Sequence, residues 1–223
     1  MASGFPGSID NFTDPLSNSS LSSPSHAGQH ADLNDAVEKI ETYMGLVKVI
    51  PTSVSSAGGT SATLAANGTV TVGAGNTSVT VNGAFSSLYD NYRIIISNMV
   101  MSSGGGGLRI TLGTVAAGAN YYFGGTYVDI GTAAITGFRG NNVGYFLCGT
   151  STGSNAFSNT LDILNPYATA RTTFPPTISF TETGTVGHNV GFHNADTSYT
   201  AFIIHTATGT MTGGTIRVYG YRN

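Results

Sequence analysis

Short apolar segments separated by turn residues recur from residue 84 to the end of the sequence, and they limit the possible folds more than any other feature. The segments are 92–97, 108–112, 121–130, 144–148, 160–164, 177–181, 201–205 and 215–221. Gly, Asn, Pro or Ser residues bound each one, and no segment with a helical period lies between them. This pattern is typical of antiparallel sandwiches and jelly rolls. We therefore expect a mainly β protein, with a jelly-roll-like β-sandwich over residues 84–223 whose final strand is held in the sheet and central to the fold.

The preceding segment, residues 46–83, reads as a linker and a β-hairpin. Thr69–Val72 and Ser78–Val81 both alternate apolar and polar residues, and Gly73–Asn76 between them is rich in turn formers. Alternation on both sides of a Gly/Asn turn predicts that the two strands pair with each other. Later in the chain, Pro175-Pro176 precedes a predicted strand, and the missing N–H groups predict a position at a sheet edge.

Residues 26–45 are predicted to form one short helix. Ser25 is a suitable N-cap and Gly45 a suitable C′ residue. The apolar positions form a short heptad seam of Leu33, Val37, Ile40 and Met44. The seam could pack on the β domain of its own chain or on copies of itself around a symmetry axis. Because an isolated helix of this length is marginal in water, we favour self-association, with the helix as an oligomer seed.

Residues 1–25 have neither a helical nor a strand period, although apolar side chains are spaced along them at Phe5, Ile9, Phe12 and Leu16. Such a segment can be a disordered tail or an extended arm that orders on a partner surface. The regular spacing of the four apolar residues favours the arm.

Charge is scarce: only 9% of the residues are charged, and the formal net charge is −3. The six arginines are scattered, so we expect no basic patch for nucleic acid or for an anionic membrane surface. No apolar run is long enough to cross a bilayer, and the first residues lack the pattern of a secretory signal. Cys148 is the only cysteine and is expected to be a buried small hydrophobe.

Sequence motifs for catalysis are lacking. The spacing of the histidines matches no compact metal motif, and the pair His26 and His30 is weakly specific. Asp129 and Asp162 are the best candidates for two carboxylates facing each other, as a glycosidase would need. We expect no enzyme activity, no cofactor and no metal site.

Two segments are candidate contact surfaces for a ligand. Tyr121, Tyr122 and Tyr127 cluster around Gly124-Gly125, where aromatic rings could stack on sugars, although alternating aromatics in strands more often face the core. The polar segment 187–199, predicted to be a loop, adds His193, Asp196 and Tyr199.

Two parts of the chain resemble structural proteins of tailed-bacteriophage particles, of the short tail fibre, minor tail protein or head fibre type. The first is Phe5–Gly45, in which His30-Ala-Asp-Leu-Asn-Asp-Ala36 precedes a short acidic helix. The second is the β region, marked by Ser87–Ile96, Asn120-Tyr-Tyr and the closing Ile216–Asn223.

The resemblance implies a non-enzymatic virion component, made in the host cytoplasm and released with the particle. Residues 1–45 would attach it to other virion proteins, the helix would seed a homotrimer, and the β head would bind a host-surface glycan or protein. Two alternatives remain open: a capsid head fibre or decoration protein, and a carbohydrate-binding adhesin module.

Overall fold

The computed structural model describes residues 26–43, 45–102, 107–115, 118–150, 156–180 and 184–221. The chain divides after Gly45 into a unit containing helix α1 and a β body that runs from Leu46 to Tyr221. Each unit is described by itself.

Helix α1 spans His26–Tyr43, as predicted from the sequence. Three residues of the predicted seam are exposed: Leu33 by 54%, Val37 by 44% and Ile40 by 41%. The fourth, Met44, and the arm residues Phe5, Ile9, Phe12 and Leu16 lie outside the described residues. Of the helical residues that the structure describes, none belongs to a helix long and apolar enough to cross a membrane.

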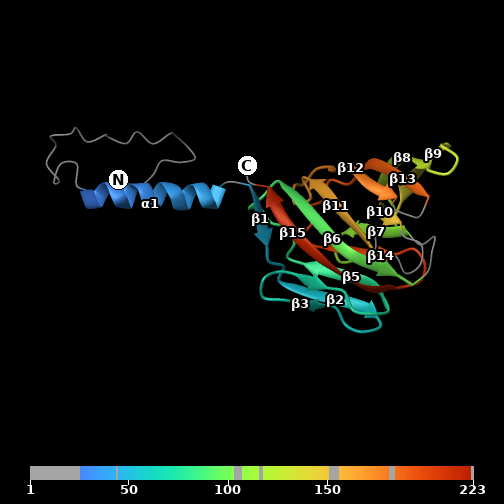
Figure 1. The fold of residues 1–223 in the computed structure, drawn as a ribbon, viewed down its shortest axis with the longest axis horizontal. Helices are drawn as coiled ribbons and strands as arrows, with labels where there is room; N and C mark the ends of the chain where they lie inside the picture. The colour runs from blue at the N-terminus through green and yellow to red at the C-terminus, as the bar shows by residue number, and fades with distance from the viewer. Residues whose placement is uncertain are drawn as a thin grey trace. The chain divides into compact units, whose positions relative to one another are not determined.

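The β body is one sheet system of 15 strands, which pair antiparallel except for one parallel pair (Figure 1). Its first strands are β1 (Leu46–Val49), β2 (Ser53–Gly58), β3 (Thr63–Leu64), β4 (Val70–Thr71), β5 (Asn76–Asn82), β6 (Asn91–Met101) and β7 (Gly107–Leu112). Its later strands are β8 (Tyr121–Asp129), β9 (Ile135–Val143), β10 (Phe146–Thr150), β11 (Phe157–Leu164), β12 (Thr172–Phe180), β13 (Thr185–His193), β14 (Phe202–Thr206) and β15 (Met211–Tyr221). The prediction of a mainly β fold with one preceding helix is confirmed for the described residues.

The strands follow the order β10-β7-β14-β5-β15-β6-β11-β12-β13-β8-β9. The sheet nearly closes on itself, because β10 also meets β12 through the parallel pair Thr150 and Phe180. Strands β13, β8 and β9 continue beyond this junction. They form, with β12, a four-stranded region that ends at β9.

The core lies inside the sheet system and follows the strand alternation. On β6, Tyr92, Ile94 and Ile96 are fully buried while their neighbours along the strand are half-buried. Phe146 of β10 stacks on Phe174 of β12, with ring centroids 4.3 Å apart, so aromatic packing reinforces the junction at which the sheet closes.

Strand β15 is central, as predicted, and pairs with β1, β4, β5 and β6. Its last described residue, Tyr221, donates a 2.7 Å hydrogen bond to Asp162 of β11. Arg93 of β6 donates two 2.8 Å hydrogen bonds to the same carboxylate. Burial alone would raise the pKa of Asp162, but these hydrogen bonds and the Arg93 charge outweigh it and hold the pKa below its usual value.

The predicted hairpin of Thr69–Val72 and Ser78–Val81 is wrong. β4 pairs with β3 and β15, whereas β5 pairs with β2, β14 and β15. The turn residues between them are engaged elsewhere, because the Asn76 amide donates to the carbonyls of Thr60 and Gly73. The strands within residues 46–83 therefore pair with other strands of the sheet, and the segment is not a separate linker and hairpin.

The predicted edge position of Pro175-Pro176 is also wrong. Both prolines lie inside β12, which runs between β11 and β13. The pairing of β12 with β13 shifts register between Phe174 and Thr177, so the prolines occupy a bulge where no ladder N–H is needed.

The sequence pattern missed β1, β2, β3, β9 and β13. β9 is an end strand of the sheet order and is exposed along most of its length, so it has no alternation to detect. β13 replaces the first half of the loop predicted at 187–199. Its glycines lie where any side chain would strike the neighbouring strand: a Cβ at Gly187 would overlap Thr126, and one at Gly191 would overlap Tyr122.

Two histidines of the β body should make the fold sensitive to mild acid. Burial lowers the pKa of His193, and burial together with the Arg109 charge lowers that of His205. Both imidazoles are therefore neutral in the fold, whereas in the unfolded chain they become protonated near pH 6.5. The free energy of unfolding should be independent of these groups above about pH 6.5 and should fall as the pH drops toward about 5. Thermal melts at several pH values, for the wild type and for His193→Gln and His205→Gln, measure this dependence. Each variant should lose less stability than the wild type as the pH falls. An equal loss in the wild type and both variants would contradict the role given to these histidines.

Candidate functional site

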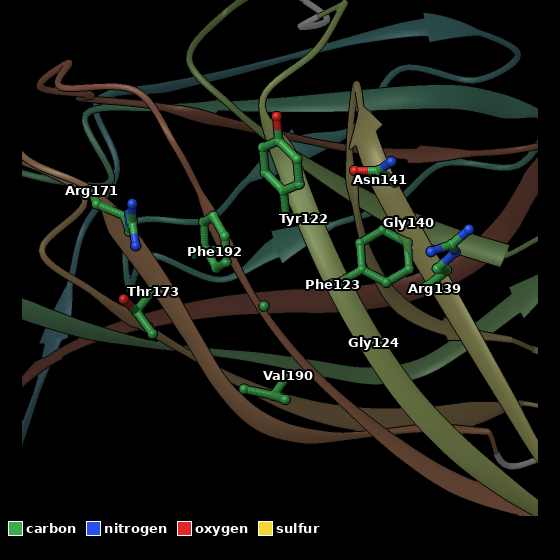
Figure 2. Close-up of a pocket in the computed structure, with 11 residues that line it drawn as sticks. Tyr122, Phe123, Gly124, Arg139, Gly140, Asn141, Arg171, Thr173, Val190 and Phe192 are labelled. Atoms are coloured by element: carbon green, nitrogen blue, oxygen red, sulfur yellow. The ribbon is translucent and has the colours of Figure 1, made fainter.

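An open groove of about 480 Å³ lies on the outer face of the four-stranded region. It crosses β12, β13, β8 and β9, which are neighbours in this order (Figure 2). The lining residues are Tyr122, Phe123, Gly124, Arg139, Gly140, Asn141, Arg171, Thr173, Val190, Gly191 and Phe192.

The alternation of side chains along β8 and β13 decides what the groove contains. Tyr121 and His193 form one cross-strand pair, and Tyr122 and Phe192 form the next. The first pair points inward and is buried, with its rings stacked at 4.1 Å. The second pair points outward and is half-buried, with its rings stacked at 5.2 Å and 19°. The floor of the groove is therefore formed by Tyr122 and Phe192 on the outer face of the sheet, and Tyr121 and His193 lie on its inner face.

An arginine extends this outer stack. The Arg171 guanidinium carbon lies 4.5 Å from the centre of the Phe192 ring. Its Nε and Nη2 atoms donate to the Asn194 side-chain oxygen at 3.1 and 2.8 Å. Phe192 is thus held between Arg171 and Tyr122, while Tyr122 lies between Phe192 and Asn141 in Figure 2. One face of the Tyr122 ring is covered by Phe192, and the other is directed toward β9.

Gly124 leaves the middle of the groove open. Its cross-strand partners are Val190 on β13 and Arg139 on β9. A Cβ at Gly124 would have only the Phe138 carbonyl oxygen within contact range, at 3.7 Å. The next residue differs sharply, because a Cβ at Gly125 would overlap the His188 carbonyl oxygen. Gly125 is needed for strand pairing, whereas the absence of a side chain at Gly124 provides space above the sheet.

The predicted contact residues are only partly brought together. Tyr122 lines the groove, but the prediction is wrong for Tyr121 and His193, because both are buried in the core. Tyr127 lies outside the lining set and packs against Phe138, with ring centroids 6.4 Å apart. Tyr199 is half-buried and its hydroxyl lies 2.7 Å from His193 Nε2, so it supports the core pair. Asp196 is exposed but does not line the groove.

Sequence reasoning missed most of the groove, including Arg139, Asn141, Arg171 and Phe192. The useful signal was the period of two along 121–129: if Tyr121 and Phe123 face the core, Tyr122 and Gly124 must face outward. No local motif identifies the two arginines, since only the pairing of distant strands brings them to one surface.

The two candidate catalytic carboxylates, Asp129 and Asp162, do not form a catalytic pair. Asp162 is engaged by Arg93 and Tyr221, and Asp129 Oδ1 accepts a turn hydrogen bond from the Thr132 N–H. Their strands are separated by β12 and β13, so the two carboxylates do not face each other. Cys148 is fully buried as predicted, and burial raises the pKa of its thiol well above the usual value. Within the described residues, no three His, Cys, Asp or Glu side chains gather as metal ligands would.

No family model, curated protein or solved structure matches this chain.

Gly124 and Gly125 provide a matched test of how the groove is built. Gly124→Ala should leave the melting temperature nearly unchanged, because its Cβ enters open space. Gly125→Ala should destabilise the β body by about 2 kcal/mol or more, because the strands must separate to admit the methyl group. Thermal or denaturant unfolding measures both variants; equal losses of stability would contradict the described packing of β8 against β13.

Proposed function

We propose that the chain is a non-enzymatic structural component of a tailed-phage particle, a short tail fibre or tail-tip protein whose β body binds the host surface. The groove over β12, β13, β8 and β9 is the observation that carries host binding. Its aromatic floor, amide and guanidinium groups are the elements with which proteins bind sugars and other polar surface ligands. The resemblance of Phe5–Gly45 and of the closing strand to phage virion proteins supports the context.

The exposed seam on α1 supports a role in assembly. Leu33, Val37 and Ile40 lie on one face of the helix with heptad spacing and are each more than 40% exposed. Apolar residues with this pattern gain stability by packing against equivalent helices. In our proposal, three chains join through this seam into a homotrimer, and residues 1–45 attach the trimer to other virion proteins.

A capsid head fibre or decoration protein would use the same parts, with the arm bound to the capsid instead of the tail. An adhesin module could use the groove in the same way, but it would leave the exposed seam without a purpose. The seam therefore favours a component of an assembly over a free binding module.

A charge placed in the seam tests the oligomer. Ile40→Asp should lower the oligomer's melting temperature or shift its sedimentation toward the monomer, because association would bury an unpaired carboxylate. Ala31→Asp is the matched control, since this exposed residue lies on the opposite face of α1. If Ile40→Asp and Ala31→Asp sediment and melt like the wild type, the seam does not hold the oligomer.

Competition for host cells tests the binding role. Purified protein should slow the adsorption of particles that carry it, and Gly124→Leu should compete poorly because its side chain fills the groove without entering the core. Equal competition by Gly124→Leu and the wild type would remove the groove from host binding, and no competition by the wild type would contradict the receptor-binding role.

A further inference from the structure

The charge of the groove indicates which ligands it can select. Arg139 and Arg171 line it, and none of its lining residues is acidic. Within the described residues, the Arg139 guanidinium has no carboxylate partner, whereas Arg93 is paired with Asp162. A site lined by two positive charges and no negative one favours an anionic ligand.

Arg171 is prepared for binding before a ligand arrives. Stacking on Phe192 and two hydrogen bonds to Asn194 fix the plane of its guanidinium. Asn194 uses two of the five N–H donors of the guanidinium, so three remain for a ligand. Because the side chain is already ordered, binding an anion here costs little additional conformational entropy.

The neutral part of the groove suits a ring. The Tyr122 face that is not covered by Phe192 is directed toward Asn141, and Gly124 leaves open space beside it. The C–H groups on the face of a pyranose pack well against the negative face of an aromatic ring, and an amide can bond the sugar hydroxyls. Arg139 lies on β9 and Arg171 immediately precedes β12. They are three strand spacings, about 14 Å, apart across the strands and about four residues apart along them, so their separation is on the order of 20 Å.

We propose that this groove binds an acidic glycan, with a sugar ring against Tyr122 and anionic groups at Arg171 and Arg139. The inference rests on the proposed function, because it names the ligand class of the same host-binding surface. The anionic groups can be uronate carboxylates or phosphodiesters, since a guanidinium binds both through paired hydrogen bonds. The separation of the arginines requires a ligand of more than one sugar unit.

A single-stranded nucleic acid also combines rings with negative charge, but it fits the groove less well. It carries a phosphate at every nucleotide, and proteins that bind it track the backbone with a continuous basic groove. Here only two cations line the site, with a neutral floor between them. Widely spaced charges match a glycan that carries its acidic groups at intervals.

Binding of the full-length protein to immobilised polymers tests the proposal. The probes are hyaluronate, in which every second sugar bears a carboxylate, its carboxyl-reduced form, poly(glycerol phosphate) bearing sugar substituents, and oligo(dT). The wild type should bind hyaluronate, the phosphate polymer or both. If hyaluronate binds, the carboxyl-reduced polymer should bind at least about tenfold more weakly. The affinity for each acidic polymer that binds should fall as the salt concentration rises. Binding to one acidic polymer alone would identify the carboxylate or the phosphate as the anionic group.

Charge-removing variants locate the binding. Arg139→Gln and Arg171→Gln should each lower affinity for the bound polymer by about tenfold or more, whereas Arg217→Gln, which removes a positive charge from β15, should not. Gly124→Leu supplies a second test that leaves the charges and the core intact. The proposal is overturned if neither acidic polymer is bound better by the wild type than by these groove variants, or if oligo(dT) is preferred. If the acidic polymers fail while Gly124→Leu still loses competition for host cells, the host-binding role stands and the anionic ligand is wrong.

Discussion

The pairing of β8 with β13 determines both the core and the groove of this part of the molecule. Side chains alternate between the faces of a sheet, so a slip of one residue would exchange every inward residue for an outward one. In the observed register, Tyr121 and His193 face inward while Tyr122 and Phe192 face outward. Gly125, Gly187 and Gly191 hold this register, because a side chain at any of them would strike the partner strand. The aromatic floor of the groove is thus a consequence of how its core side is packed.

Charged residues are scarce in the β body, and the arginines that the structure describes occupy different environments. Arg93 joins β6 to Asp162 of β11, and Arg109 lies 3.7 Å from the centre of the Tyr145 ring. Arg217 donates to the Thr69 hydroxyl. Arg139 and Arg171 are the ones that line the groove. In a chain with few other charges, their field is weakly opposed, and this is why two side chains are enough to bias the site toward anions.

The sequence allowed the fold class to be predicted, but much less of the site. Helix α1 and strands such as β6 and β7 could be identified because their apolar residues have a clear period, and β14 could be identified because its apolar residues form a short continuous run. β9 was not predicted because an exposed strand needs no apolar residues. β13 was not predicted because its Gly, His and Asn residues resemble those of a loop. The hairpin prediction failed because local turn residues can serve long-range contacts, as Asn76 does with Thr60. The groove depends on strand pairings between residues about 70 positions apart, such as Tyr122 with Phe192 and Gly124 with Val190.

Electron microscopy of intact particles labelled with an antibody fragment against the β8–β9 hairpin, residues 121–143, tests the central claim most directly. We propose that the β body is part of the particle and that its four-stranded face is turned toward the host. The expected result is label on the tail, at or near its tip. Label over the capsid would contradict the tail assignment in favour of a head fibre or decoration protein, and particles that contain no protein recognised by the fragment would contradict the virion assignment itself.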